Sequence, residues 1–489
     1  MTEPLDLLIT DADLVTATDR MRTDIGVRAG RVVALGERLG MRTHRHIDAG
    51  GRLVTPGGVD AHCHIEQRAS TGVMTADDFL SGTVSAAHGG TTTVLPFAAQ
   101  QRGQSLRQVV KDYHAAATPK AVIDYGFHLI VSDPTEAVLG QELPALIADG
   151  YTSFKVYMTY DSLRLNDRQM LDVFATARRE GALVMVHAEN HDMIGWLADR
   201  LLSQGHRAPK FHTIAHSRLA EGEAARRAID LARLADASVF IVHVSEPGAM
   251  AAIRTAQTEG AKVFAETCPQ YLFLTAADTD RPGMEGAMWC CSPPPRDTSA
   301  QEAMWRGLTN GTFAVFSSDH APYSMDENGK LAKGPDVAFK YMVNGVPGLE
   351  VRMPLLLSEG VGASRMDLHR FVALTATNPA KIYGLFPTKG TIAVGSDADI
   401  VVWDRDRAVT IRWADLHDRV GYSPYEGRTV RGWPDLVIRR GEVVVDQGRL
   451  TAEPGSGRFL PRARPDSARP AGRPATGLSV DEAFGADLY

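Results

Sequence analysis

Eight short apolar runs alternate with segments of helical character through most of residues 56–389 of this 489-residue chain. The intervening segments Gln104–Ala117, Gln169–Glu180 and Glu221–Ala235 carry apolar residues at three- and four-residue spacing, which is typical of amphipathic helices. Strands joined by crossover helices indicate a parallel sheet, and eight such units close a (β/α)₈ barrel. The predicted strands are Val59–Ala61, Thr92–Pro96, Val122–Ile130, Ser153–Met158, Leu183–Val186, Val239–Val242, Lys262–Glu266 and Phe313–Phe316.

Strand-rich blocks lie on either side of the predicted barrel, in residues 1–55 and 390–454. Neither block has enough strands to cover its apolar faces alone, so we expect the two to pair into one composite β-sandwich. In residues 455–489, prolines among Arg, Ser and Gly predict an extended C-terminal tail, or one that wraps a neighbouring subunit.

The charge and hydropathy of the chain exclude two classes of partner. A net charge of -7 without a basic stripe argues against nucleic acid, and no apolar run approaches the length of a membrane span. The sequence holds four cysteines, Cys63, Cys268, Cys290 and Cys291, and they suit reduced thiols better than a disulfide framework. We therefore expect a cytoplasmic protein whose partners are small molecules.

Metal-ligating residue types recur at the ends of the predicted strands. His62 and His64 close the first strand, and residues two apart on a strand point to the same side, so both can face the barrel mouth. His187, His243 and Asp319 follow the fifth, sixth and eighth strands. Imidazole and carboxylate are common zinc ligands, and barrel active sites lie at the carboxyl ends of the strands. Their joint placement predicts a metal site.

Lys155 lies inside the fourth predicted strand, where alternation places its side chain in the barrel lumen. An ammonium beside metal ions would be repelled, and burial already disfavours its charged form. Reaction of the amine with carbon dioxide would give an anionic carbamate that can bridge two ions. The alternative is a lysine that extends to the barrel rim.

Motifs along nearly the whole chain resemble those of the dihydropyrimidinase and hydantoinase branch of the amidohydrolase superfamily. The segments that carry the resemblance are Pro56–His64, Ser153–Met158, Val186–Asn190, Ile241–Ser245, Cys291–Arg296, Ser318–Pro322, Asn344–Glu350 and Gly395–Asp399.

The resemblance implies two zinc ions per subunit. His62, His64 and Asp319 would hold one ion, His187 and His243 the other, and carboxylated Lys155 and a hydroxide would bridge them. Tyr160 falls where the family places a phenol that polarises the scissile carbonyl, and Ser292 and Asn344 fall where it binds the ring. Asp319 would carry the proton from water to the ring nitrogen, and Asp60 and His320 would orient ligands. A homotetramer, or a homodimer, is also implied.

The implied reaction is reversible hydrolysis of a 5,6-dihydropyrimidine or a hydantoin to the N-carbamoyl acid. The segment after His64 is more polar at Gln67 and Arg68 than is typical of hydantoinases, which favours a smaller or more polar ring. Glu66 stands where dihydroorotases place an arginine for the substrate carboxylate, so that activity is disfavoured.

Other functions remain as alternatives. Another cyclic amide, such as an allantoin-like compound or a simple imide, could be the substrate. A single-ion deaminase would not need Lys155, and the Ser-Pro-Pro and Asn-Gly-Val-Pro-Gly segments favour the cyclic-amide branch over the phosphotriesterases. A non-catalytic scaffold related to dihydropyrimidinases would have lost metal ligands, which this chain retains.

Overall fold

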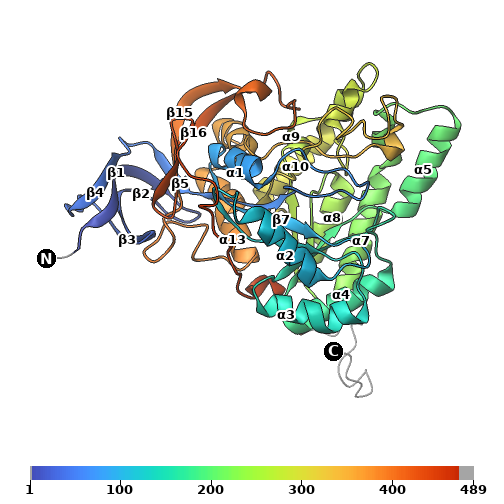
Figure 1. Cartoon of the computed structure of the whole chain (residues 1–489), viewed down its shortest axis with the longest axis horizontal. Coiled ribbons are helices and arrows are strands. Elements are labelled where there is room, and N and C mark those ends of the chain that lie inside the picture. Colours follow the sequence, from blue (N-terminus) through green and yellow to red (C-terminus); the bar gives the residue numbers. More distant parts are fainter. Residues whose placement is uncertain (1–2, 473–489) are drawn as a thin grey trace.

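The strands between residues 56 and 389 pair in chain order around a barrel, in a computed structural model that describes residues 3–472 (Figure 1). The hydrogen-bonded order is β14-β13-β12-β11-β10-β9-β7-β6, with β8 beside β7. A bridge between Cys63 and His320 brings the first and last strands together, so the barrel is nearly closed. Its strands are β6 (Gly58–Cys63), β7 (Thr91–Ala99), β8 (Asp124–Tyr125), β9 (His128–Ile130), β10 (Ser153–Tyr157), β11 (Leu183–His187), β12 (Val239–Ile241), β13 (Val263–Thr267) and β14 (Val315–Phe316).

Side chains alternate between the two faces of each barrel strand. On β10, Phe154 and Val156 belong to the core between strands and helices, whereas Tyr157 belongs to a second cluster inside the barrel. Lys155 is 1% exposed, and its amine lies 4.4 Å from the centre of the Phe97 ring, a residue of the inner cluster. The predicted entry of Lys155 into the lumen is therefore confirmed.

Helices cover the outside of the barrel, as the sequence periodicity predicted (Figure 1). The three predicted helices correspond to α2 (Leu106–Ala117), α4 (Asp167–Glu180) and α7 (Arg218–Leu234). The last two begin earlier than predicted because Asn166 and Ser217 cap their first turns through side-chain oxygens. Within residues 3–472, no helix is both long and apolar enough to cross a membrane.

The remaining helices complete the covering layer and the connections. They include α1 (Phe79–His88), α3 (Leu143–Ala148), α5 (His191–Ser203), α6 (Phe211–Ala215), α8 (Pro247–Thr258), α9 (Gln270–Phe273), α10 (Thr298–Asn310), α11 (Arg352–Leu356), α12 (Leu368–Val372) and α13 (Asn378–Ile382).

The two chain ends were predicted to pair into one composite β-sandwich, and they do pair, in one mixed sheet beside the barrel. Its order is β18-β17-β16-β15-β5-β1-β2-β3, with β4 beside β1. The two ends join where β15 pairs antiparallel with β5, from Ile400 opposite Pro56 to Trp403 opposite Leu53. The strands are β1 (Leu5–Val15), β2 (Arg20–Arg28), β3 (Arg31–Gly36), β4 (Thr43–Asp48), β5 (Leu53–Pro56), β15 (Ile400–Thr410), β16 (Thr429–Arg439), β17 (Glu442–Asp446) and β18 (Arg449–Leu450).

The C-terminal segment packs against its own barrel. The amide of Gly457 donates to the Ala121 carbonyl, and the amide of Leu460 donates to the Tyr125 carbonyl. This pairing lies beside the predicted strand Val122–Ile130, which is divided into β8 and β9. Of the predicted tail, residues 455–472 follow this course, and residues 473–489 lie outside the described part of the chain.

Candidate active site

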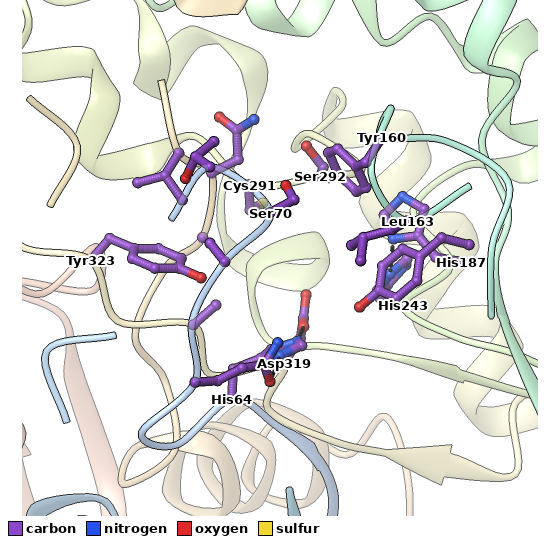
Figure 2. A pocket seen from close by; sticks show the side chains of 18 of the residues that line it. His64, Ser70, Tyr160, Leu163, His187, His243, Cys291, Ser292, Asp319 and Tyr323 are labelled. Carbon is purple, nitrogen blue, oxygen red and sulfur yellow. Dashed lines mark hydrogen bonds and ion pairs between the residues drawn. The ribbon is translucent and has the colours of Figure 1, made fainter. Parts of the chain in front are cut away.

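The carboxyl ends of the barrel strands bring all six candidate ligands to one place. His62 lies within β6, His64 follows it, Lys155 lies on β10 and His187 ends β11. His243 follows β12 and Asp319 follows β14. Figure 2 shows His64 and Asp319 side by side at the base of a pocket, with His187 and His243 together on one wall.

Partners outside the cluster fix the orientation of three of the four histidine rings. The Nδ1 of His62 donates to Glu266, the Nδ1 of His64 donates to Gln67 over 2.8 Å, and the Nε2 of His187 donates to Glu189 over 2.8 Å. In each of these three rings, the second nitrogen makes no contact with Glu266, Gln67 or Glu189. Neutral histidines held in this way are the usual arrangement around protein-bound metals.

The free ring nitrogens point toward one another. The Nε2 of His62 lies 2.8 Å from the Lys155 amine and 3.1 Å from Asp319 Oδ1. The Nε2 of His64 lies 3.4 Å from the same Asp319 oxygen, and the Nδ1 of His187 lies 2.8 Å from the Nε2 of His243. Ligand atoms of His62, His243 and Asp319 all lie within 4.8 Å of one another, which makes them a possible metal-binding triad.

Burial lowers the pKa of most basic groups of this cluster. It lowers the pKa of His64 to about 4, holds that of His243 well below its ordinary value, and lowers the pKa of Lys155 to about 8. The pKa of Asp319 is also lowered, but for a carboxyl group this favours the charged form. Burial alone would raise its pKa, but His62, His64 and His243 outweigh burial and hold the pKa well below its usual range. At His62, burial and the charge of Lys155 would lower the pKa, but Glu266 and Asp319 outweigh them and raise it. The cluster therefore combines an ionised carboxylate with histidine rings whose pKa is lowered, at His64, His187 and His243.

Two of these residues have a backbone conformation that is unusual for side chains with a Cβ atom. His243 has φ +41° and Asp319 has φ +46°, both in the left-handed region. Such conformations cost free energy and persist where the surrounding structure holds them, and they concentrate at functional sites. The backbone here serves to direct the two side chains at the cluster.

The pocket above the cluster contains the three predicted substrate-binding residues. Tyr160, Ser292 and Asn344 all line it, and Tyr160 and Ser292 lie together in Figure 2. Burial raises the pKa of Tyr160, and a contact of its hydroxyl with Ser292 offsets only part of the rise, so the phenol keeps its proton at neutral pH. The buried Oδ1 of Asn344 has no hydrogen-bond partner within the described residues, although the residue itself lines the pocket.

The polar side chains of the segment after His64 make hydrogen bonds and ion pairs within the protein. Gln67 is buried, and its side-chain amide oxygen accepts a hydrogen bond from His64. Arg68 is exposed and donates to the Gly72 carbonyl over 2.9 Å. Glu66 pairs with Lys120 at 2.7 Å, away from the pocket lining. In this segment, Gln67, Ala69, Ser70 and Thr71 line the pocket, and Arg68 does not.

Two buried carboxylates at the site were missed by the sequence reasoning. Glu266 accepts from His62, from the His243 amide and from the Ser317 hydroxyl, and Glu189 holds both His187 and His216. One signal could have identified Glu266, because it is a carboxylate at the last position of a predicted apolar strand.

Asp60 and His320 lie behind the ligands. One oxygen of Asp60 accepts from the amides of His62 and Ser318, and His320 donates to Asp77 over 2.9 Å. Neither belongs to the group of residues able to hold an ion together. Their contacts support the backbone that carries His62 and Asp319.

Comparisons with known proteins identify the family of this chain. The amidohydrolase family model matches residues 53–444. The chain is 41% identical to the D-hydantoinase of Ralstonia pickettii over 461 residues, which cover 94% of this chain and 99% of the relative. It is 41% identical to the D-hydantoinase of Geobacillus stearothermophilus, over 94% of this chain and 96% of the relative. The crystal structure of a dihydropyrimidinase from Brevibacillus agri superposes with a TM-score of 0.91 at 40% identity, over 95% of this chain and 99% of that one.

Proposed function

Since this chain belongs to the amidohydrolase family, in its hydantoinase and dihydropyrimidinase branch, we propose that it opens 5,6-dihydropyrimidines or hydantoins to N-carbamoyl amino acids. The broader class is established: the chain is a hydrolase that acts on cyclic amides. The observation that carries the proposal is the convergence of four histidines, Lys155 and Asp319 beneath a pocket lined by Tyr160, Ser292 and Asn344.

We propose that two zinc ions occupy the cluster. His62, His64 and Asp319 would hold one ion, and His187 and His243 the other. The donor set supports this assignment, because ring nitrogens of His187 and His243, from different strands, lie 2.8 Å apart, and the ionised carboxylate of Asp319 lies in the same cluster.

Lys155 would join the two ions as a carbamate. Its amine is buried among possible ligands rather than near solvent, and burial lowers its pKa to about 8, which increases the fraction of uncharged amine. An uncharged amine can add carbon dioxide with release of one proton, which gives an anionic group with two oxygen ligands. When bound, two zinc ions lower the pKa of water and polarise a carbonyl oxygen.

The chain's own side chains would supply the remaining steps. Asp319 accepts a proton from the attacking water and delivers it to the departing ring nitrogen. The Tyr160 hydroxyl, which keeps its proton, donates to the carbonyl oxygen as negative charge develops there. Ser292 and Asn344 bind the ring amide, for which Asn344 offers an unpaired acceptor.

We further propose a homotetramer that works in the cytoplasm. The family resemblance supports the homotetramer. All four cysteines are free and buried, which suits a reducing compartment.

A substrate panel tests the proposal. Purified enzyme supplied with zinc and bicarbonate is assayed on dihydrouracil, dihydrothymine, hydantoin, 5-phenylhydantoin, allantoin, dihydroorotate and succinimide, with metal analysis of the same sample. We expect about two ions per subunit and turnover of dihydrouracil or hydantoin. Turnover of allantoin or succinimide alone would move the enzyme to another ring, and a chain that binds no metal would contradict the metal-dependent mechanism.

A further inference from the structure

Lys330 is a buried amine that the proposed reaction does not use. Its side chain is 1% exposed. The Nζ donates to the carbonyl of Gly345 over 2.8 Å and to the carbonyl of Cys290 over 3.1 Å. These two carbonyls belong to segments that are far apart in sequence, and both segments reach the wall of the substrate pocket.

A tight turn inserts Lys330 between these segments. The Lys330 amide donates to the Ser324 carbonyl over 2.8 Å, and the Asp326 carboxylate accepts from the Asn328 amide and the Ser324 hydroxyl. A Cβ atom on Gly329 would lie 2.0 Å from the Ser324 carbonyl oxygen, so the turn requires glycine at this position. The local sequence therefore specifies the inward direction of the lysine side chain.

The position of Lys330 is costly for a lysine. Its burial lowers the pKa to about 8, and the groups that raise it are the thiols of Cys290 and Cys291 rather than a carboxylate. Within residues 3–472, Lys330 forms no ion pair with an acidic side chain, and the nearby cluster around Cys290 contains Val337 and Met342. A buried amine without a carboxylate partner destabilises a fold, so this one is best explained by what its two hydrogen bonds hold.

Those bonds hold the two segments that carry the predicted ring-binding residues. Cys290 lies two residues before Ser292, and Gly345 directly follows Asn344. The Cys290 carbonyl also accepts from the Gly345 amide over 3.0 Å, so the segments meet at one carbonyl oxygen that Lys330 shares. Within residues 3–472, the buried side-chain oxygen of Asn344 has no hydrogen-bond partner, so no hydrogen bond to that atom fixes the side chain.

We propose that Lys330 is a positioning residue for substrate binding, which fixes the spacing between the Ser292 and Asn344 segments by joining the Cys290 and Gly345 carbonyls. The inference rests on the proposed function, since it concerns the same pocket. Lys330 lies behind the pocket wall and is absent from the pocket lining, so it acts through the backbone rather than by contact with the ring.

The test compares Lys330→Met with Lys333→Met, which removes an exposed lysine three residues along the same segment. The substrate is hydantoin or dihydrouracil, whichever the wild-type enzyme turns over. We expect Lys330→Met to raise KM about 10-fold while kcat stays within about 3-fold, because the lost contact supports binding of ground state and transition state alike. Bound metal stays unchanged, and Lys333→Met keeps the wild-type KM.

Hydrogen exchange supplies a measurement that does not depend on turnover. Lys330→Met should speed exchange in peptides that cover residues 290–292 and 343–346 and leave β10 unchanged. Lys330→Gln keeps a donor without the charge and should fall between Lys330→Met and the wild type in both measurements. If Lys330→Met does not fold, Lys330→Gln is compared directly with the wild type.

Distinct outcomes separate the two proposals. A folded Lys330→Met enzyme with wild-type KM and wild-type exchange would overturn the role of Lys330, as would an equal rise of KM in Lys333→Met. Failure of the wild-type enzyme on every ring would instead count against the proposed function, and faster exchange in the two segments would still support Lys330 as the group that holds them.

Discussion

Hydrogen bonds to neighbouring side chains orient three of the four histidine rings of the candidate metal site. Glu266, Gln67 and Glu189 each accept from one nitrogen of a histidine and so select the tautomer that leaves the other nitrogen free. His243 is the exception, because its buried Nδ1 has no partner within the described residues. Three rings are thus directed by side chains, and His243 is directed by its left-handed backbone.

Replacement of Lys155 tests the proposed bridge at the scale of one residue. Lys155→Ala removes the only amine of the cluster, and we expect activity to fall more than about 100-fold with loss of bound zinc. Acetate or propionate should restore part of the activity, because a short carboxylate can occupy the space of a carbamate. The exposed Lys111→Ala serves as the control. Normal activity in Lys155→Ala would contradict the bridge.

The ligand residues that could be predicted from the sequence all lie on a predicted strand or directly after one. His62, His64 and Asp319 stand at strand ends, and strand alternation alone sends Lys155 inward. Partners such as Gln67 and Glu189 were not predictable in this way, because their role depends on which atom faces which ring. Ser292 and Asn344 lie in loops and were found only through family resemblance.

At the scale of whole elements, local patterns predicted the type of each element better than its ends. Apolar periodicity identified α4, but its first turn is set by the reciprocal contacts of Asn166 and Gln169, which the pattern does not register. The divided strand β8–β9 lies beside the tail, where Tyr125 forms a bridge with Phe459. A contact between residues about 330 positions apart is a tertiary feature that no local pattern contains.

The tail anchors itself in the barrel through Arg462. Its guanidinium is buried and donates to the Ser153 hydroxyl over 2.6 Å and to the Phe127 carbonyl, and Ser153 lies on the same strand as Lys155. Of the predicted extended tail, the described residues 455–472 form one short 3₁₀ turn, Asp466–Ala468. Its buried arginine shows that it is also part of the barrel's packing.

Arg462→Met should destabilise the fold without touching the pocket. It leaves the Ser153 hydroxyl and the Phe127 carbonyl short of a donor, which costs roughly 2–4 kcal/mol. We expect a lower Tm in thermal unfolding, with zinc content retained at low temperature. Arg464→Met removes an exposed arginine of the same segment and should leave Tm unchanged. Equal Tm values for the two variants would show that the tail is not an anchor.

In the whole molecule, a buried group of charges fastens the composite sheet to the barrel. The Lys389 amine lies 2.7 Å from Asp124 of β8, 3.1 Å from Asp397 and 2.8 Å from Asp399, the latter two just before β15. Asp399 also accepts from Thr92 of β7 over 2.9 Å. The Gly395–Asp399 motif, which the sequence showed only as a family feature, therefore has a structural role at the junction.

Lys389→Met would leave these carboxylates without their cation, so the loss of stability should depend on pH. In the wild type, burial lowers the pKa of Lys389, but the three carboxylates outweigh burial and raise it, so the amine stays charged until the pH exceeds the ordinary lysine value of about 10.4. In the variant, the pKa of Asp399, which burial already raises, should rise further. A carboxyl whose pKa is raised on folding lowers the free energy of unfolding as the pH rises through that pKa.

We expect Lys389→Met to be less stable than the wild type by roughly 3–5 kcal/mol at pH 8, and by less toward pH 5. The difference in Tm between the two proteins, taken at each pH, reports this loss. Lys381→Met, an exposed lysine nearby, is the control, and a Tm difference that is independent of pH would argue against the ionic junction.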